Sequence, residues 1–311
     1  MGVISVIIPL FNKEATIRKA IDSVLSQTYD QFEIIIVNDG SDDNSLSVVR
    51  SIPDARITVI EQPNAGVSAA RNRGITEAHG EYVTFLDADD EWDNDFLETI
   101  VSLIDRYPLA KVYGTNYRLC DCHGNKYETT INGVDFKGED NGMIDDYFGV
   151  AAISSPPVCS ICIAMRRSDM LEIGGFPKGI KSGEDLLTWA RLLVNGGLAY
   201  CLSAHSTYNL DEGYEYGSQP VRRQDPGDPV GKELKKLLRK NPDAKGLKAY
   251  ISHWHKMRAS VAIRFGERKE TIKECIMALI YNPLNINVFP FVILSILPSR
   301  LRTAIIGMKK H

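Results

Sequence analysis

The stretch that most constrains this chain is residues 82–90, YVTFLDADD, in which a short apolar run ends in a cluster of carboxylates. The run at 82–86 consists of β-type residues and predicts a buried strand of a mainly parallel sheet. Asp87, Asp89 and Asp90 follow it, and carboxylates this close resist ionising together away from water unless a cation is present. Open α/β sheets bind ligands at the carboxyl ends of their strands. The stretch therefore predicts a divalent-metal site for a phosphorylated ligand, with carboxylates that merely open the next helix as the alternative.

Apolar periodicity predicts further strands and helices on both sides of this stretch. Short β-branched runs indicate strands, and apolar residues at helical spacing indicate the helices between them. The predicted strands are 3–9, 32–37, 56–60, 82–86 and 111–116, and the predicted helices are 17–25, 46–49, 68–78 and 96–104. Strands that alternate with helices are typical of βαβ units on a parallel sheet, so the predicted fold class is α/β.

Charge and cysteine content narrow the function. A net charge of −4 disfavours a partner held by its phosphate backbone, so we expect no nucleic acid. The six cysteines show no disulfide framework, which favours a reducing compartment. Cys159 and Cys162 lie in an apolar run, where reduced cysteines behave as small hydrophobic residues rather than as a metal or redox site. No basic segment precedes the first apolar run, so we expect no signal peptide and a cytoplasmic protein.

The last third of the chain has a different pattern. Residues 219–229 hold three prolines and predict a linker or loop. Helical spacing follows at 232–240, 247–265 and 269–281, the last two forming an antiparallel hairpin broken at Gly266.

A final apolar run lies beside basic residues. Residues 288–297 are far fewer than the ~20 needed to cross a bilayer. The basic residues that follow are Arg300, Arg302, Lys309 and Lys310. The run predicts either a contact with an anionic membrane face or a terminal helix packed on its own domain.

Chemically useful side chains follow the other predicted strands. Phe11, after the first strand, offers a flat face to a base, and Asp39, after the second, can accept from a ring N–H and a ribose hydroxyl. Arg71, after the third, can pair with carboxylates or phosphate. Taken singly, each has a plainer interpretation: Phe11 as a core residue, Asp39 as a turn residue and Arg71 as part of a solvated helix face. Together with the Asp cluster they predict a pocket for a nucleoside diphosphate and its metal.

Several linked motifs resemble family 2 glycosyltransferases of the bacterial polysaccharide type. The resemblance runs from about residue 4 to residue 208. Its motifs are SVIIPLFN at 5–12, IVNDGSDD at 36–43, NAGVSAARN at 64–72, FLDADD at 85–90, IGGF at 173–176 and EDL at 184–186 followed by Trp189. The resemblance implies a GT-A fold and inverting transfer of a sugar from a nucleotide donor, usually a UDP-sugar.

The same resemblance implies roles for individual residues. Asp39 would hold the base, with Phe11 beside it, and Asp87 would face the ribose. The full set expected around the nucleotide is Pro9, Phe11, Asn12, Glu14, Asp39, Asn64, Arg71, Asp87 and Ala88. Asp89 would hold Mn²⁺ or Mg²⁺, which stabilises the departing diphosphate.

Asp185 would be the catalytic base, because inverting transfer needs a carboxylate that takes the proton of the acceptor hydroxyl. A capping carboxylate at a helix start is the alternative for Asp185. Glu184 and Trp189 are expected on the acceptor side, although Trp189 can equally be a packing residue. Lys13 receives no specific role, and His205 is disfavoured as a third metal ligand because a lone histidine is more often structural.

These expectations combine into one domain plan and one function. The plan is a catalytic domain at 1–218, divided into a nucleotide-sugar half (1–117) and an acceptor half (118–218), with a helical appendage at 219–311. The acceptor would be a glycan or a lipid-linked molecule at the inner membrane face. A sugar-phosphate nucleotidyltransferase is disfavoured because residues 9–14 lack a Gly-rich basic loop. A non-catalytic nucleotide-sugar-binding scaffold is the alternative from another class.

Overall fold

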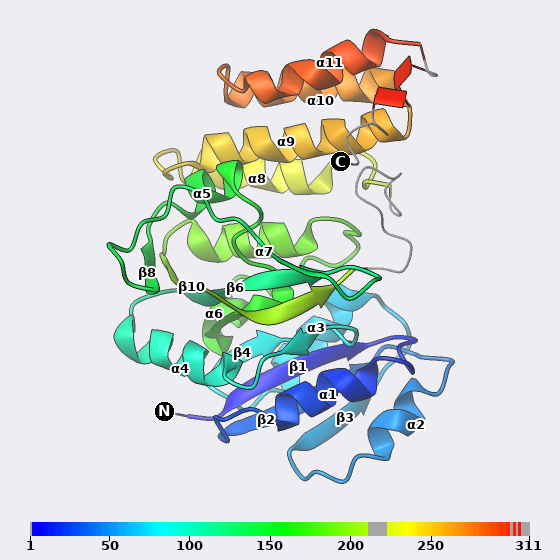
Figure 1. The fold of residues 1–311 in the computed structure, drawn as a ribbon, viewed down its shortest axis with the longest axis vertical. Coiled ribbons are helices and arrows are strands. Elements are labelled where there is room, and N and C mark those ends of the chain that lie inside the picture. The colour runs from blue at the N-terminus through cyan, green and yellow to red at the C-terminus, as the bar shows by residue number, and fades with distance from the viewer. Residues whose placement is uncertain (1, 211–222, 299–300, 303, 306–311) are drawn as a thin grey trace.

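The computed structural model describes residues 2–210, 223–298, 301–302 and 304–305 (Figure 1). Its described strands form a single sheet with the path β3-β2-β1-β4-β9-β6-β10-β5, while β7 pairs with β6 and β8 with β10. The strands are β1 Ile4–Leu10, β2 Phe32–Asn38, β3 Ile57–Glu61, β4 Tyr82–Phe85, β5 Glu91–Trp92, β6 Val112–Cys120, β7 Lys126–Glu128, β8 Asn141–Ile144, β9 Ile163–Arg166 and β10 Leu198–Asn209.

Six strands of this path run in one direction. The pairings of β1 with β2, β1 with β4, β2 with β3, and β6 with β10 are parallel. β9 is antiparallel to both β4 and β6, so β6 runs in the same direction as β4. The predicted α/β class with a mainly parallel sheet is therefore confirmed.

Helices cover both faces of the sheet. The helices of this part are α1 Ile17–Leu25, α2 Ser45–Arg50, α3 Val67–Glu77, α4 Phe96–Arg106, α5 Tyr147–Ile153, α6 Arg167–Glu172 and α7 Glu184–Leu193. Alternate residues of β1 point to opposite faces, as the period of two requires. Ile8 packs in the cluster that contains α1, α2 and α4, and Ile7 packs in the one that contains α3, α6 and α7. Two buried cores thus fix the sheet from both sides.

Five of the strands were not predicted: β5, β7, β8, β9 and β10. One of them, β9, lies inside the sheet between β4 and β6. β9 belongs to the apolar run around Cys159 and Cys162, where the sequence shows no alternation because this part of the chain is buried on both faces. All six cysteines are free.

The C-terminal helices form a separate stack (Figure 1). They are α8 Pro229–Lys240, α9 Leu247–Arg264, α10 Arg268–Tyr281 and α11 Phe289–Ile296. Figure 1 shows α8 and α9 on the side of α5 and α7, with α10 and α11 farthest from β1. The predicted hairpin is confirmed: α9 and α10 pack together, and Gly266 between them has φ +76°, which suits glycine. No helix of the described residues is long and apolar enough to cross a membrane.

A buried ionic network joins α9 to α10. His255 Nδ1 lies 2.5 Å from Glu274 Oε2, and Arg258 Nε donates to Glu274 Oε1 at 2.8 Å. Burial alone would raise the pKa of Glu274, but the hydrogen bonds from His255 and Arg258 lower it to about 2. The network keeps this carboxylate charged inside the hairpin.

Two predicted domain limits can be compared with the structure. The limit between 218 and 219 lies outside the described residues, as does the start of the predicted linker, and α8 begins at Pro229. The division between 117 and 118 falls inside β6, so the two halves share a strand.

Candidate functional site

The loops after β1 and β2 are locked together by their own polar side chains. Asn12 donates its backbone N–H to Ser41 Oγ at 3.1 Å, and its Oδ1 accepts from the Asp42 amide at 3.0 Å. Glu14 Oε2 accepts from the Asn44 amide at 2.8 Å. Asn12 and Glu14, both predicted to contact nucleotide, therefore also shape the rim on which a nucleotide would lie.

Two further predicted nucleotide residues lie at the same strand end. Pro9 is part of β1 and is half-buried, whereas Phe11 just beyond it is 46% exposed. An aromatic ring exposed at the carboxyl end of a parallel strand is available to stack on a ligand.

Asp39 holds the next loop in place. Its carboxylate is buried and accepts from the amides of Ala65 at 2.9 Å and Gly66 at 2.8 Å, and from Gln62 Nε2 at 2.7 Å. Asn64, in the loop so held, is exposed. Gly40 has φ +74°, and a Cβ there would lie 2.8 Å from the Asn64 nitrogen, so only glycine fits this close approach.

Arg71 connects the Asp cluster to the start of α7. Its Nη2 donates to both carboxylate oxygens of Asp87, at 2.7 and 3.0 Å, and its Nη1 lies 3.7 Å from Glu184 Oε1. The guanidinium carbon also lies 5.2 Å from the centre of the Phe176 ring. Arg71 is 3% exposed, and neither Nε nor Nη1 has a hydrogen-bond partner among the described residues. A buried arginine with unused donors is suited to accepting a further anionic group.

The other two carboxylates of the cluster have different surroundings. Asp89 Oδ2 lies 2.5 Å from Lys13 Nζ, and its side chain is 29% exposed. Asp90 is buried and accepts from the Asn209 amide at 2.7 Å, while Asn209 Nδ2 donates to the Asp89 carbonyl at 2.6 Å. Burial and then the Asp87 charge raise the pKa of Asp90 well above its usual value. Asp89 is therefore the member best placed for a metal.

The carboxylates of this cluster fit a hard divalent cation. Oxygen ligands are what Mg²⁺ and Mn²⁺ prefer, and Ala88 between Asp87 and Asp89 is buried and adds no competing group. Asp87 is engaged by Arg71 and Asp90 by Asn209, whereas Asp89 keeps an accessible carboxylate beside one ammonium.

The two carboxylates that open α7 are both perturbed. Gly183, with φ +84°, precedes the helix, and Leu186 donates its amide to Asp185 Oδ1 at 2.7 Å. Burial, and next the Asp185 charge, raise the pKa of Glu184 to about 7, against the opposing effect of Arg71. Burial likewise raises the pKa of Asp185. Carboxylates shifted towards neutral pH are candidates for proton transfer.

Of the two roles considered for Trp189, an acceptor contact or a packing residue, the structure favours packing. It is fully buried, and its ring meets Phe176 edge to face with 5.5 Å between centroids. Through Phe176, it supports the ring against which Arg71 lies.

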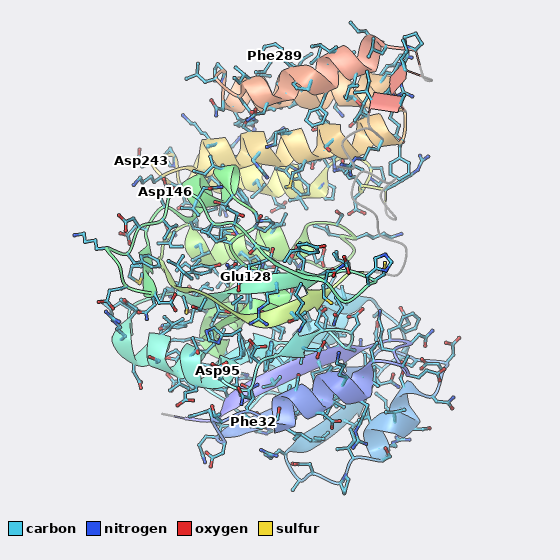
Figure 2. The ribbon with its side chains drawn as sticks, in the orientation of Figure 1. Phe32, Asp95, Glu128, Asp146, Asp243 and Phe289 are labelled. Carbon is cyan, nitrogen blue, oxygen red and sulfur yellow. The ribbon has the colours of Figure 1, made fainter. Side chains whose placement is uncertain are left out.

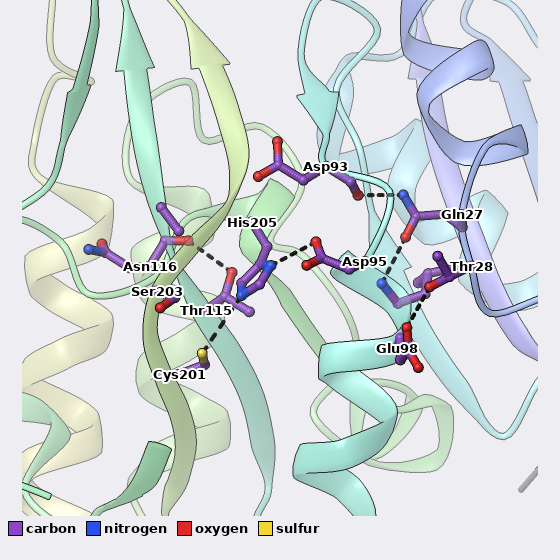
Figure 3. A network of polar contacts seen from close by, with 12 residues as sticks. Gln27, Thr28, Asp93, Asp95, Glu98, Thr115, Asn116, Cys201, Ser203 and His205 are labelled. Carbon is purple, nitrogen blue, oxygen red and sulfur yellow. Dashed lines mark hydrogen bonds and ion pairs between the residues drawn. The ribbon is translucent and has the colours of Figure 1, made fainter. Parts of the chain in front are cut away.

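His205 lies in a separate polar network (Figure 3). Its Nδ1 is 2.9 Å from Asp95 Oδ1, and its Nε2 is 3.8 Å from Cys201 Sγ. Ligand atoms of Asp93, Asp95 and His205 lie within 4.8 Å of one another, although Arg118 also pairs with Asp93. Among the described residues, the side-chain hydrogen-bond contacts of His205 are therefore to Asp95 and Cys201, not to the carboxylates of the Asp cluster.

Asn209 and Lys13 are the functional candidates that sequence reasoning missed. Asn209 ends β10, a strand that was not predicted, so nothing marked it as a strand-end residue. Lys13 was noticed without a role, and its partner Asp89 is 76 positions away in the chain.

A comparison with protein families matches more than half of this chain to one family. The model of glycosyl transferase family 2 matches residues 5–174. The glycosyltransferase GlyA of Streptococcus pneumoniae is 43% identical over 126 residues, which cover 40% of this chain and 18% of GlyA. An uncharacterized glycosyltransferase of Haemophilus influenzae is 39% identical over 141 residues, covering 44% of this chain and 56% of the relative. The chain thus spans between 18% and 56% of the length of these two relatives.

Solved structures of the same fold cover the chain more fully. Residues 1–349 of S. aureus TarS superpose with a TM-score of 0.63 at 18% identity, covering 100% of this chain and 88% of that one. The same TarS fragment in complex with UDP-GlcNAc gives a TM-score of 0.60 at 20% identity, with the same coverage. The mannosyltransferase PcManGT of Pyrobaculum calidifontis, in complex with GDP-Man and Mn²⁺, gives 0.59 at 18% identity, covering 99% of this chain and 86% of that one. These likenesses confirm the GT-A fold, and with the family match they make this chain a member of glycosyl transferase family 2.

Proposed function

We propose that this chain is an inverting glycosyltransferase that moves a sugar from a nucleotide donor, most simply a UDP-sugar, to a hydroxyl group. The observation that carries the proposal is that Arg71 contacts both Asp87 and Glu184, because these contacts join the donor side to the half-buried carboxylates Glu184 and Asp185. TarS with UDP-GlcNAc and PcManGT with GDP-Man support a nucleotide sugar as the ligand class.

Asp185 takes the proton in this proposal. Its carboxylate accepts the proton of the acceptor hydroxyl as that oxygen attacks the anomeric carbon. The bond between the anomeric carbon and the diphosphate oxygen breaks, and the nucleoside diphosphate leaves on the opposite face, which inverts the configuration. The raised pKa of Asp185 brings its basicity closer to that of the group it serves.

Other residues of the chain bind and orient the donor. Asp39 and Phe11 hold the base, and Asp87, fixed by Arg71, meets the ribose. Asp89 holds Mn²⁺ or Mg²⁺, which when bound offsets the charge of the leaving diphosphate. PcManGT with Mn²⁺ supports this choice of cation.

A direct test combines donor binding with turnover. UDP with Mn²⁺ is expected to raise the melting temperature, because it binds the folded state only. Asp185→Asn should keep that shift and lose roughly 10²–10⁴-fold in transfer rate, measured as released UDP. The control is Asp169→Asn. Asp169 lies outside the site and pairs with Lys111, so the folded fraction of this variant should keep the wild-type rate. Full turnover by Asp185→Asn would favour a scaffold, and no shift with any nucleotide would overturn the donor site.

We further propose that the acceptor is presented at the cytoplasmic face of a membrane. Eighteen large apolar side chains are exposed in the described part of the chain, and ten of them lie at or beyond Ile272. They are Ile272, Ile276, Ile280, Leu284, Ile286, Phe289, Ile293, Ile296, Leu301 and Ile305, which we call the apolar face. Figure 2 shows Phe289 of this face at the opposite end of the molecule from Phe32.

The charge beside the apolar face favours a lipid surface as its occupant. Lys269 and Lys273 lie on the same helix as Ile272 and Ile276, and Lys309 and Lys310 follow Ile305 in the sequence. Apolar residues bordered by basic ones are suited to an anionic bilayer.

A further inference from the structure

A cavity lies outside the nucleotide site, between the α9–α10 hairpin and residues 223–227. Its volume is about 1040 Å³. Basic side chains dominate its lining: Lys181, Arg223, Arg258, Arg268, Lys269 and Lys273. We propose that this cavity, called here the basic cavity, binds a phosphate or diphosphate group of the acceptor. The proposal rests on the transferase function and names the class of its acceptor.

Charge is the first support. Six basic residues line the cavity against three acidic ones, Asp225, Glu267 and Glu270, in a chain whose net charge is −4. Three of the six already pair with glutamates: Arg223, Arg258 and Lys273. Lys181, Arg268 and Lys269 have no carboxylate partner among the described residues. Positive charge gathered in a concave, partly apolar site raises the local concentration of anions.

The acidic residues of the cavity are already engaged. Asp225 Oδ2 accepts from the amides of Lys181 at 2.8 Å and Ser182 at 3.2 Å. Glu267 pairs with Arg223 at 3.0 Å and Glu270 with Lys273 at 2.9 Å.

An arginine from the end of the described chain adds an unused donor. Arg302 Nη2 lies 3.2 Å from the position that a Cβ on Gly266 would take, and Gly266 lines the cavity. Its Nη1 is buried and has no hydrogen-bond partner among the described residues. A buried donor without a partner costs free energy that an anion would recover.

The basic cavity is joined to the proposed catalytic base. Lys181 lines it, and Asp185 follows four positions later across the turn at Gly183. A Cβ on Gly183 would lie 2.7 Å from the Trp254 ring, and Trp254 Nε1 donates to Asp228 Oδ1 at 3.0 Å. The turn is therefore packed tightly against α9. An anionic group held in the cavity would tether an acceptor whose hydroxyl reaches towards Asp185.

The apolar wall fits the remaining part of such an acceptor. Val261, Ala262 and Phe265 line one side of the cavity. Both a prenyl diphosphate and a polyol-phosphate chain combine a phosphate with carbon-rich segments, so the shared chemistry is phosphate beside an apolar stem.

Calorimetric titration with inorganic pyrophosphate in EDTA tests the site without metal at Asp89. We expect wild-type protein to bind and the double variant Lys269→Glu/Lys273→Glu to bind at least about tenfold more weakly, because two attractive charges become repulsive. Lys248→Glu, an exposed lysine of α9 outside the lining, should bind as wild type does. Equal binding by all three proteins, or no binding by wild type, overturns the proposal.

The donor site is measured separately in the same proteins. Binding of UDP with Mn²⁺ should be unchanged in the double variant, so a loss confined to pyrophosphate marks the basic cavity. Failure of UDP to bind wild type would overturn the transferase proposal and leave the pyrophosphate result to stand on its own.

Competition then separates two sources of the phosphate. Farnesyl diphosphate in detergent micelles and a soluble glycerol-phosphate oligomer are each titrated against bound pyrophosphate. In proteins that keep Lys269 and Lys273, displacement by farnesyl diphosphate alone identifies a lipid-linked acceptor. Displacement by the glycerol-phosphate oligomer alone identifies a polymeric acceptor. Displacement by neither overturns an acceptor role for the cavity.

Discussion

The Arg71 guanidinium grips the Asp87 carboxylate through a single nitrogen, with Nη2 at 2.7 and 3.0 Å from the two oxygens. Its other terminal nitrogen is turned towards Glu184, at 3.7 Å. One buried side chain thus bridges the end of β4 and the start of α7, which are about a hundred residues apart in sequence. The donor and base sides of the candidate site are placed relative to each other by this contact.

Replacing Arg71 should damage both stability and transfer. Arg71→Gln leaves Asp87 and Glu184 without their cation. Breaking a fully buried pair costs about 3–5 kcal/mol, and because these two carboxylates are partly exposed we expect a loss of about 2–3 kcal/mol. Denaturant unfolding measures this loss. Arg73→Gln, which removes an exposed partner of Glu77 on the same helix, should change stability by less than about 1 kcal/mol. Equal effects of the two changes would contradict the bridging role.

Asp185 should set the acid side of the pH–rate profile. Its carboxylate must be ionised to accept a proton, so the rate rises with pH through the raised pKa of Asp185. Burial, and next the Asp185 charge, raise the pKa of Glu184 to about 7, so Glu184 is still neutral while Asp185 loses its proton. Glu184→Gln is neutral as well, and the acid limb of kcat/KM should therefore stay where it is in the wild-type enzyme. A limb that moves to lower pH would mean that the two carboxylates titrate as one coupled pair.

The strand-end loops could be predicted because their signals are local. A β-branched run followed by Asp, Asn or Gly marks each loop, and parallel strands bring their carboxyl ends to one edge. Asp39, Arg71 and Asp87 were found in this way. β10 escaped because its first four residues are all buried and its pairing with β6 has register shifts, so no alternation is visible. Because β10 was not predicted, Asn209 at its end was not recognised as a candidate either.

Pairings between distant residues were beyond sequence reasoning. The contact of Lys13 with Asp89 joins positions 76 apart, and no spacing rule links them. The hydrogen bonds from the Ala65 and Gly66 amides to Asp39 could not be predicted either, because the sequence does not show which loop a carboxylate in a turn will bind. These contacts depend on how the strands are ordered in the sheet.

Lys13 should compete with the metal at Asp89. The ammonium lies 2.5 Å from Asp89 Oδ2 in a partly exposed pair. Such pairs are worth about 0.2–1 kcal/mol, so Lys13→Met should lower the Mn²⁺ concentration needed for half-maximal UDP binding by roughly two- to fivefold. Lys19→Met, which removes an exposed partner of Glu91, is the control. A higher Mn²⁺ requirement would show instead that Lys13 assists the bound diphosphate.

His253 should make the stability fall on acidification. Its Nδ1 lies 2.9 Å from the Ala152 carbonyl, which ties α9 to α5. Burial, and next the Lys256 charge, lower the pKa of His253 to about 4. A lowered histidine pKa adds stability that is full above the unfolded value and is lost as pH falls through the folded one. Unfolding free energy should thus drop by about 2–3 kcal/mol between about pH 7 and pH 4 on this account.

The variant His253→Gln isolates that contribution. It keeps a donor for the Ala152 carbonyl but carries no titrating group, so its stability should fall less steeply over the same range. His123→Gln, at an exposed histidine, should keep the wild-type slope. Identical slopes for wild type and His253→Gln would show that other groups cause the acid sensitivity.

Charged substitutions on the apolar face should release the protein from lipid. Ile276 and Ile280 are 53% and 63% exposed and lie one turn apart on α10, so a bilayer can cover both at once. Burying each side chain is worth about 1.5–3 kcal/mol, so Ile276→Asp/Ile280→Asp should lower partition into anionic vesicles by well over tenfold, measured by flotation. Leu109→Asp, at a 93% exposed leucine after α4, should float as wild type does. Because the anionic headgroups attract the neighbouring lysines, neutral vesicles should also bind wild type more weakly. Equal flotation of the double variant and wild type would remove the apolar face from the membrane proposal, and a dimer measured by light scattering that the same substitutions dissociate would assign it to a second copy of the chain.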